Sequence, residues 1–151
     1  MTDGSTPRRV AVVTGASSGI GEATARLLAK EGWHCVLVAR REDVLHNLAT
    51  EIGGEIEACD VGDREAVALA TARILDRRPA VDLLVNSAGI LARGSFVDAS
   101  PELIERALAV NYLGGVWMMR GLLVYRKALI AAKPQLGDVI RNIGRGHELP
   151  A

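Results

Sequence analysis

A glycine-rich loop between two regular patterns is the feature that most limits what this chain can fold into. Residues 9–14 form a short β-branched run, and Gly15-Ala16-Ser17-Ser18-Gly19-Ile20-Gly21 follows at once. From there to about residue 31, apolar side chains recur at helical spacing at Ile20, Ala23, Leu27 and Leu28, and Gly32 is placed to end the helix. This order of strand, glycine loop and helix is typical of a βα unit in a parallel sheet.

The same alternation continues to about residue 120. We expect further strands at 34–39, 55–59 and 81–86, and helices at 41–51, 63–77 and from residue 100 onward. Asp63 and Ser100 are each placed to cap a helix. Apolar strands alternating with amphipathic helices predict a parallel sheet covered on both faces. The expected fold class is therefore α/β, a Rossmann-type doubly wound sheet truncated to about four or five strands.

The three glycines of the loop have the properties that phosphate binding needs. We expect Gly15 to permit a tight turn, Gly19 to let the backbone approach a pyrophosphate, and Gly21 to let the helix pack close to the sheet. The free N–H groups at the start of the helix would bind the phosphates. A purely structural turn also uses glycine, but the strand–turn–helix context favours a phosphate site.

These residues resemble the cofactor loop of the short-chain dehydrogenase/reductase family, and three further motifs follow in the family's order. Asp60-Val61 resembles the pair that contacts adenine. Asn86-Ser87-Ala88-Gly89 is similar to the family's NNAG motif, with serine in place of the second asparagine. Asn111, after Val110, resembles the catalytic asparagine. The resemblance implies cofactor contacts at Gly15, Ser17, Ser18, Gly19, Ile20, Gly21, Arg40, Asp60, Val61, Asn86, Ala88, Gly89 and Val110.

The end of the second strand bears on which nicotinamide cofactor is bound. An acid there would accept hydrogen bonds from the ribose 2′-OH and repel a 2′-phosphate. The sequence instead has Ala39 followed by Arg40 and Arg41, and a guanidinium suits a phosphate. We therefore expect NADP in preference to NAD. The alternative is that both arginines are solvated charges that open the second helix.

By the same resemblance, the family's reaction needs a tyrosine, a lysine four residues later and a serine. Here Tyr112 is followed at that spacing by Val116, and Tyr125 by Leu129. Gly144 and Arg145 stand where the serines of the family's fifth strand would fall. We expect a truncated NADP-dependent member whose parent reaction is hydride transfer between NADP(H) and a carbonyl or alcohol. The alternative is a non-catalytic dinucleotide-binding or interaction module.

The resemblance also suggests how the chain is divided. We expect a leader at 1–8, an NAD(P)-binding Rossmann domain at 9–120, and a divergent segment at 121–151. That last segment would continue as a helix over 121–132 and contains a candidate fifth strand at 138–143. The apolar surplus of the helix that begins at residue 101, and an open sheet edge, predict a homo-oligomer or pairing with related chains.

Composition excludes several partners. Eighteen basic residues balance eighteen acidic ones and aromatic residues make up 3%, which disfavours nucleic acid. No apolar run approaches membrane-spanning length. His34, His46 and His147 lack metal-ligand spacing, so we expect no metal site. Two cysteines, Cys35 and Cys59, without a CxxC motif, together with the lack of a signal peptide, predict a cytoplasmic protein.

Overall fold

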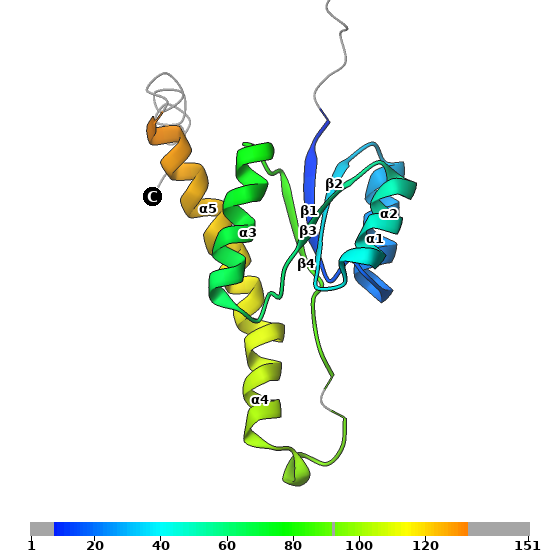
Figure 1. Ribbon diagram of the computed structural model, residues 1–151, viewed down its shortest axis with the longest axis vertical. Coiled ribbons are helices and arrows are strands. Elements are labelled where there is room, and N and C mark those ends of the chain that lie inside the picture. Colours follow the sequence, from blue (N-terminus) through cyan, green and yellow to red (C-terminus); the bar gives the residue numbers. More distant parts are fainter. Residues whose placement is uncertain (1–7, 92, 133–151) are drawn as a thin grey trace, which may run out of the picture.

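Four parallel strands form the centre of the computed structural model, which describes residues 8–91 and 93–132, and side chains as far as residue 123. They are β1 (Val10–Thr14), β2 (His34–Ala39), β3 (Glu55–Ala58) and β4 (Leu83–Asn86), in the order β3-β2-β1-β4 (Figure 1). β1 pairs in parallel with both β2 and β4. The strand order therefore reverses beside β1, which is where ligands bind in open α/β sheets.

Helices cover both faces of this sheet. α1 (Gly19–Lys30) and α2 (Glu42–Ile52) lie on one face, and α3 (Arg64–Arg77) and α5 (Gly114–Ala132) lie on the other (Figure 1). α4 (Pro101–Leu108) extends beyond the end of the sheet and joins α5 through a π-helical turn, Ala109–Leu113. The predicted α/β, doubly wound fold is confirmed.

Each face of the sheet has its own apolar core. The core toward α1 and α2 includes Val13, Leu37, Leu45 and Leu48. The core toward α3 and α5 includes Val12, Val36, Val67, Ile74 and Met118. Cys35 and Cys59 are free and buried in the two cores, as expected of small apolar side chains. Both faces of the sheet are apolar because helices pack on each of them, as in other parallel sheets.

Helix α1 ends as predicted, and its apolar residues are only partly buried, with Leu28 packed against the core. The N–H of Gly32, at φ +83°, donates to Ala29 O at 3.0 Å, which is the usual glycine end of a helix. Ile20 and Leu27 are exposed, whereas Gly21 and Ala25 are buried. Small residues face inward because the helix lies close over the glycine loop, and larger side chains do not fit there.

Toward the C-terminus the helical prediction for 121–132 is confirmed, since α5 runs unbroken from residue 114 to 132. It crosses residue 120, where we placed the end of the Rossmann domain. The candidate strand at 138–143 and residues 1–7 of the leader lie outside the described residues.

The predicted caps of α3 and α4 are both formed. One carboxylate oxygen of Asp63, Oδ1, accepts hydrogen bonds from Glu65 N at 2.9 Å and Ala66 N at 3.1 Å. Substituting Asp63 by alanine leaves these N–H groups without a partner. We therefore expect Asp63→Ala to lower the free energy of unfolding by about 1 kcal/mol.

Denaturant unfolding of the whole chain measures this effect. Asp76→Ala is the matched control, because Asp76 is an exposed acid on the same helix, far from its N-terminus. Equal stability losses in the two variants would contradict a capping role for Asp63.

Candidate functional site

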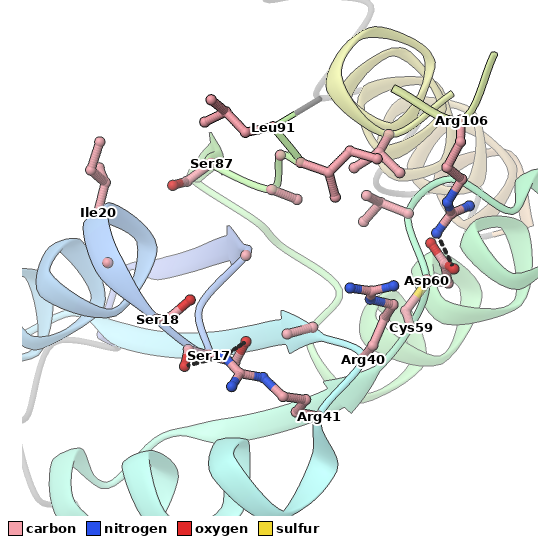
Figure 2. Close-up of a pocket in the computed structure, with 18 residues that line it drawn as sticks. Ser17, Ser18, Ile20, Arg40, Arg41, Cys59, Asp60, Ser87, Leu91 and Arg106 are labelled. Atoms are coloured by element: carbon pink, nitrogen blue, oxygen red, sulfur yellow. Dashed lines mark hydrogen bonds and ion pairs between the residues drawn. The ribbon is translucent and has the colours of Figure 1, made fainter. Parts of the chain in front are cut away.

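A cleft of about 510 Å³ opens at the carboxyl ends of the strands. Its walls come from the loop after β1, the ends of β2 and β3, the segment after β4, and the helix that follows. Figure 2 shows the labelled side chains in a ring around the opening, with Ser17 and Ser18 on one side and Asp60 and Arg106 on the other. A cleft of this size, at the point where the strand order reverses, is a ligand site by its position.

The loop after β1 is compact because two of its glycines touch other backbone. A Cβ built on Gly15, at φ +67°, would lie 2.7 Å from the backbone N of Ala88. A Cβ on Gly21 would lie 2.7 Å from the carbonyl carbon of Gly15. The expectation that Gly21 lets α1 pack close to the sheet agrees with this contact, because Gly15 directly follows β1. A side chain at Gly15 would push the loop away from the segment after β4, and one at Gly21 would push α1 away from the loop.

The third glycine faces open space. Gly19 has φ +57°, and a Cβ built there would meet nothing within 4 Å. Ser18 is the N-cap residue of α1, yet its side chain makes no capping hydrogen bond, unlike those of Asp63 on α3 and Ser100 on α4. The first N–H groups of α1 are thus free of a side-chain cap, at the positive end of the helix dipole. This is the arrangement that binds phosphate.

Thr14 joins the loop after β1 to the segment after β4. Its hydroxyl oxygen accepts hydrogen bonds from Ser87 N and Ala88 N, both at 3.1 Å, and the hydroxyl donates to Val85 O at 3.4 Å. The side chain is 1% exposed. Thr14 was not predicted as a site residue, although it directly precedes the glycine loop. It lies beneath the cleft wall and fixes the position of Ser87 and Ala88.

Asn111 supports the cleft from behind. Its side-chain oxygen accepts a hydrogen bond from Ile90 N at 2.7 Å, and its amide nitrogen donates to Ile90 O at 2.9 Å. Ile90 lines the cleft, whereas Asn111 does not. The π-helical turn around Asn111 is a local irregularity that often marks functional sites. In this structure Asn111 is a positioning residue for the segment after β4.

Three guanidinium groups and one carboxylate give the cleft its charge. Arg41 donates to Ser17 O at 3.0 Å and to Ser17 Oγ at 3.1 Å. Arg106 forms an ion pair with Asp60, with Nη2 and Oδ2 2.5 Å apart. Arg40 is the third guanidinium on the lining. The excess of positive charge favours an anionic ligand.

The carboxyl group of Asp60 is ionised at neutral pH. Burial raises its pKa, but the hydrogen bond from Gly62 N–H and the guanidinium groups of Arg106 and Arg40 outweigh this effect. The pKa therefore lies below its usual value. Asp60 thus presents a hydrogen-bond acceptor to the cleft, not a donor.

The cleft gathers most of the predicted site residues. Those that line it are Gly15, Ser17, Ser18, Gly19, Ile20, Arg40, Asp60, Val61, Ala88, Gly89 and Val110. Gly21, Asn86 and Asn111 do not line it: Asn86 ends β4, and its Cγ would lie 3.3 Å from a Cβ on Gly115.

Sequence reasoning missed several lining residues, among them Arg41, Cys59, Ser87, Ile90, Leu91 and Arg106. Arg41, Cys59, Ser87 and Ile90 carried a signal, because each is next to a predicted site residue. Arg106 carried none, since only the packing of α4 brings it to Asp60.

Cys59 lines the cleft, and its thiol is largely shielded from solvent. It is buried, and burial, followed by the negative charges of Glu57 and Asp60, raises the pKa of its thiol to about 11. Because the thiolate is the reactive form, we expect alkylation of Cys59 at pH 8 to be at least about a hundredfold slower than that of a free thiol.

The Cys35→Ala variant isolates this reaction, and iodoacetamide labelling followed by mass spectrometry measures it. Labelling in denaturant gives the rate for the free thiol. Similar rates in the folded and unfolded chains would contradict the raised pKa.

Two kinds of feature are absent from the described residues. No group of three or more histidine, cysteine, aspartate or glutamate side chains among them is arranged to hold a metal ion. None of the helices in that part of the chain has both the length and the apolar character to cross a membrane.

Comparison with known proteins agrees with the site. The sequence profile described as "short chain dehydrogenase" matches residues 9–141. An uncharacterised oxidoreductase of Mycobacterium tuberculosis is 61% identical over 67 residues, or 44% of this chain. Dehydrogenase/reductase SDR family member 7B of Bos taurus is 36% identical over 125 residues, or 76% of this chain.

Solved structures give the same result. A short-chain dehydrogenase from Streptomyces avermitilis superposes with a TM-score of 0.76 at 32% identity, over 80% of this chain. Actinorhodin polyketide ketoreductase with NADPH gives a TM-score of 0.75 at 31% identity, over 81% of this chain. The matches cover 27% and 38% of the two relatives and 45% and 49% of the two solved chains, so the chain spans less than half the length of each.

Proposed function

Because the chain belongs to the short-chain dehydrogenase/reductase family, we propose that its cleft binds NADP(H) and forms the cofactor half of an oxidoreductase. The observation that carries this proposal is the bare backbone at Gly19, beside the uncapped start of α1. It leaves room and free N–H groups where a pyrophosphate needs them. The arginines around the cleft add the charge that an anionic cofactor requires.

The preference for NADP over NAD rests on the residues that follow β2. Ala39, at the strand end, offers no carboxylate to a ribose 2′-OH, and Arg40 lines the cleft next to it. Arg41 holds Ser17 through two hydrogen bonds and so presents a guanidinium and a hydroxyl together. Guanidinium groups bind phosphate oxygens through paired hydrogen bonds. The ketoreductase neighbour, which was solved with NADPH, supports the same preference.

The chemistry that we propose for the whole protein is reduction of a small carbonyl compound or oxidation of an alcohol. The nicotinamide ring, when bound, supplies or accepts the hydride. Asp60 and Val61 would face the adenine end, and the loop from Gly15 to Gly21 would hold the phosphates. Asn111 would act by fixing Ile90, and with it the wall formed by Ala88 and Gly89.

A non-catalytic dinucleotide-binding module is the second candidate. It is favoured by one sequence fact: neither Tyr112 nor Tyr125 is followed four positions later by lysine. A positively charged ammonium at that spacing is what would lower the pKa of the phenol toward neutrality. Steady-state turnover with a panel of aldehydes and ketones separates the two candidates, since a module of this kind binds NADPH without oxidising it.

The first prediction from this proposal concerns cofactor choice. We expect the chain to bind NADPH at least about tenfold more tightly than NADH, because each charge-assisted hydrogen bond to the 2′-phosphate adds affinity. Arg40→Asp should remove or reverse the preference, since the carboxylate repels the phosphate and accepts from the 2′-OH. Titration followed by nicotinamide fluorescence measures both affinities.

Arg120→Asp is the control for this experiment, because it makes the same charge change at an exposed position on α5, outside the cleft. It should leave the preference intact. Equal affinities of the unaltered chain for the two cofactors would refute the NADP assignment.

The second prediction concerns the glycine loop. We expect Gly19→Val to abolish dinucleotide binding, because the branched side chain would fill the space that the pyrophosphate must enter. The variant is also strained by the positive φ, so a control with the same strain is needed. Gly32→Val provides it: Gly32 has φ +83°, open surroundings and a position at the opposite end of α1.

Both variants should lose similar amounts of stability in thermal unfolding, but only Gly19→Val should lose affinity for NADPH in calorimetric titration. If Gly19→Val still binds, the phosphates are held elsewhere and the proposed site is wrong.

We also propose that the chain self-associates through the β4 edge, with a second copy as the partner. The β3 edge is protected, because Glu55 and Glu57 form ion pairs with Arg73, Arg77 and Arg78. β4 carries half-buried Leu83, Leu84 and Val85, and an apolar groove of about 190 Å³ runs between it and α5. Among the described residues no strand pairs with its outer side. Such an edge favours pairing with another chain.

Light scattering at micromolar concentration should therefore report a dimer or larger species. Leu123→Lys, on the groove, should shift it toward monomer, because a charge would enter the interface. Leu69→Lys is the matched control, since Leu69 is similarly exposed but lies on α3, outside the groove. A monomer at all concentrations would overturn this proposal.

The cytoplasm is the compartment that we propose. Cys35 and Cys59 are both free thiols and buried, as in a protein kept in reducing conditions.

A further inference from the structure

The two edge strands of the sheet differ in what lies beside them. Among the described residues, β3 pairs with β2 alone and β4 pairs with β1 alone. An apolar groove runs beside β4, whereas a cluster of ion pairs lies beside β3. We call this cluster the β3 network, and its members are His34, Glu55, Glu57, Arg73, Arg77 and Arg78.

Two carboxylates of the network point into the molecule from β3. Glu55 and Glu57 are in register with Val36 and Val38, whose side chains belong to the core toward α3 and α5. The side chain of Glu57 is only 6% exposed. A carboxylate buried this deeply is destabilising unless it is paired. Inward-pointing charges on an edge strand disfavour the addition of another strand.

Each of these carboxylates is paired with two guanidinium groups. Glu57 accepts from Arg73 Nε at 2.8 Å and Nη2 at 2.5 Å, and from Arg77 Nη2 at 3.0 Å. Glu55 accepts from Arg77 Nε at 3.3 Å and from Arg78 Nε at 2.8 Å. Arg77 is therefore the member of the network that both carboxylates share.

Arg77 also occupies the outward-facing backbone of the edge strand. Cys59 N donates to Ala39 O on β2 at 2.9 Å. Backbone groups alternate in direction along a strand, so those of Ile56, at an odd separation from Cys59, point away from β2. Nη2 of Arg77 donates to Ile56 O at 3.4 Å. A strand that paired with β3 would have to displace this guanidinium from two carboxylates and a carbonyl.

We propose that the β3 network, through Arg77, limits self-association to a closed dimer in which two copies meet at their β4 edges. This inference rests on the self-association proposed above and adds the reason why it stops. Contact between the same edge of two copies is a two-fold contact, which closes. Contact between β4 of one copy and β3 of the next does not close, so copies would continue to add.

Arg77→Leu should open the β3 edge and leave the fold intact, because Glu57 retains Arg73 and Glu55 retains Arg78. Sedimentation velocity over a range of micromolar concentrations measures the size of the assemblies. We expect the unaltered chain to stop at a dimer. The average mass of Arg77→Leu should rise with concentration beyond that of a dimer, because a carbonyl of β3 becomes free to pair.

Arg26→Leu is the matched control. Arg26 also forms ion pairs with two carboxylates, those of Glu22 and Glu51, and its side chain is 35% exposed against 39% for Arg77. It lies on α1, which packs on the inner strand β1 and on β2. This variant makes the same change of charge away from both sheet edges, so its mass should follow that of the unaltered chain.

A double variant tests whether growth uses both edges. Leu123→Lys places a charge on the groove beside β4. Combined with Arg77→Leu, it leaves only the β3 edge open, so the assemblies should be no larger than a dimer. Far-UV circular dichroism of each variant, before and after assembly, separates pairing of folded chains from aggregation of unfolded ones.

Several results would overturn the proposal. It is wrong if the unaltered chain grows beyond a dimer, if Arg77→Leu keeps the size of the unaltered chain, or if the double variant grows as far as Arg77→Leu. If Arg77→Leu does not fold, Arg77→Gln is judged by the same outcomes. If the unaltered chain is a monomer, the proposed β4 contact fails; the blocking role of the network then stands only if Arg77→Leu associates.

Discussion

The contact between the backbones of Gly15 and Ala88 is the constraint on which the rest of the cleft depends. These residues follow adjacent strands, β1 and β4, and a Cβ on Gly15 would lie 2.7 Å from Ala88 N. The hydroxyl of Thr14 reinforces the contact by accepting two hydrogen bonds from the segment after β4. With the two loops held this close, α1 starts directly over the sheet edge and its first N–H groups face the opening. A methyl group at Gly15 would separate the loops and displace both walls.

The charged side chains around the cleft are predominantly positive. The end of the sheet that carries the cleft has Arg40, Arg41 and Arg106 around a single carboxylate, Asp60. Two of the arginines are engaged with groups of the cleft wall: Arg41 with Ser17, and Arg106 with Asp60. Held this way, they lose less side-chain entropy when an anion binds than free arginines would. The site is therefore organised for an anionic ligand.

The local patterns of the sequence predicted the fold well. Strand runs, helical spacing and the capping residues Asp63 and Ser100 are short-range signals, and each of them reports directly on backbone geometry. The apolar residues of α1 are only partly buried: Leu28 packs against the core, whereas Ile20 and Leu27 are exposed, because the close approach of the loop favours Gly21 there. β4 is half-buried although its sequence is as apolar as that of β1, because an edge strand is covered less.

The candidate site likewise contains residues that the sequence predicted and residues that only the structure revealed. Motif residues such as Gly19 and Asp60 line the cleft because they lie in the segments that follow the strands, and the fold places those segments at the carboxyl end of the sheet. Arg106 could not be found from sequence, since its contact with Asp60 spans 46 positions and depends on how α4 packs. Asn111 was found by its motif, but its contact with the backbone of Ile90 needed the structure.

An amide NMR titration of the 151-residue chain with NADPH tests the central claim most directly. The account predicts that the signals of Gly19, Ile20, Asp60 and Gly89 shift together and saturate at one affinity. Those of α2 and the outer face of α3, away from the cleft, should remain in place. Shifts confined to residues outside the cleft, or no shift at millimolar NADPH, would contradict it.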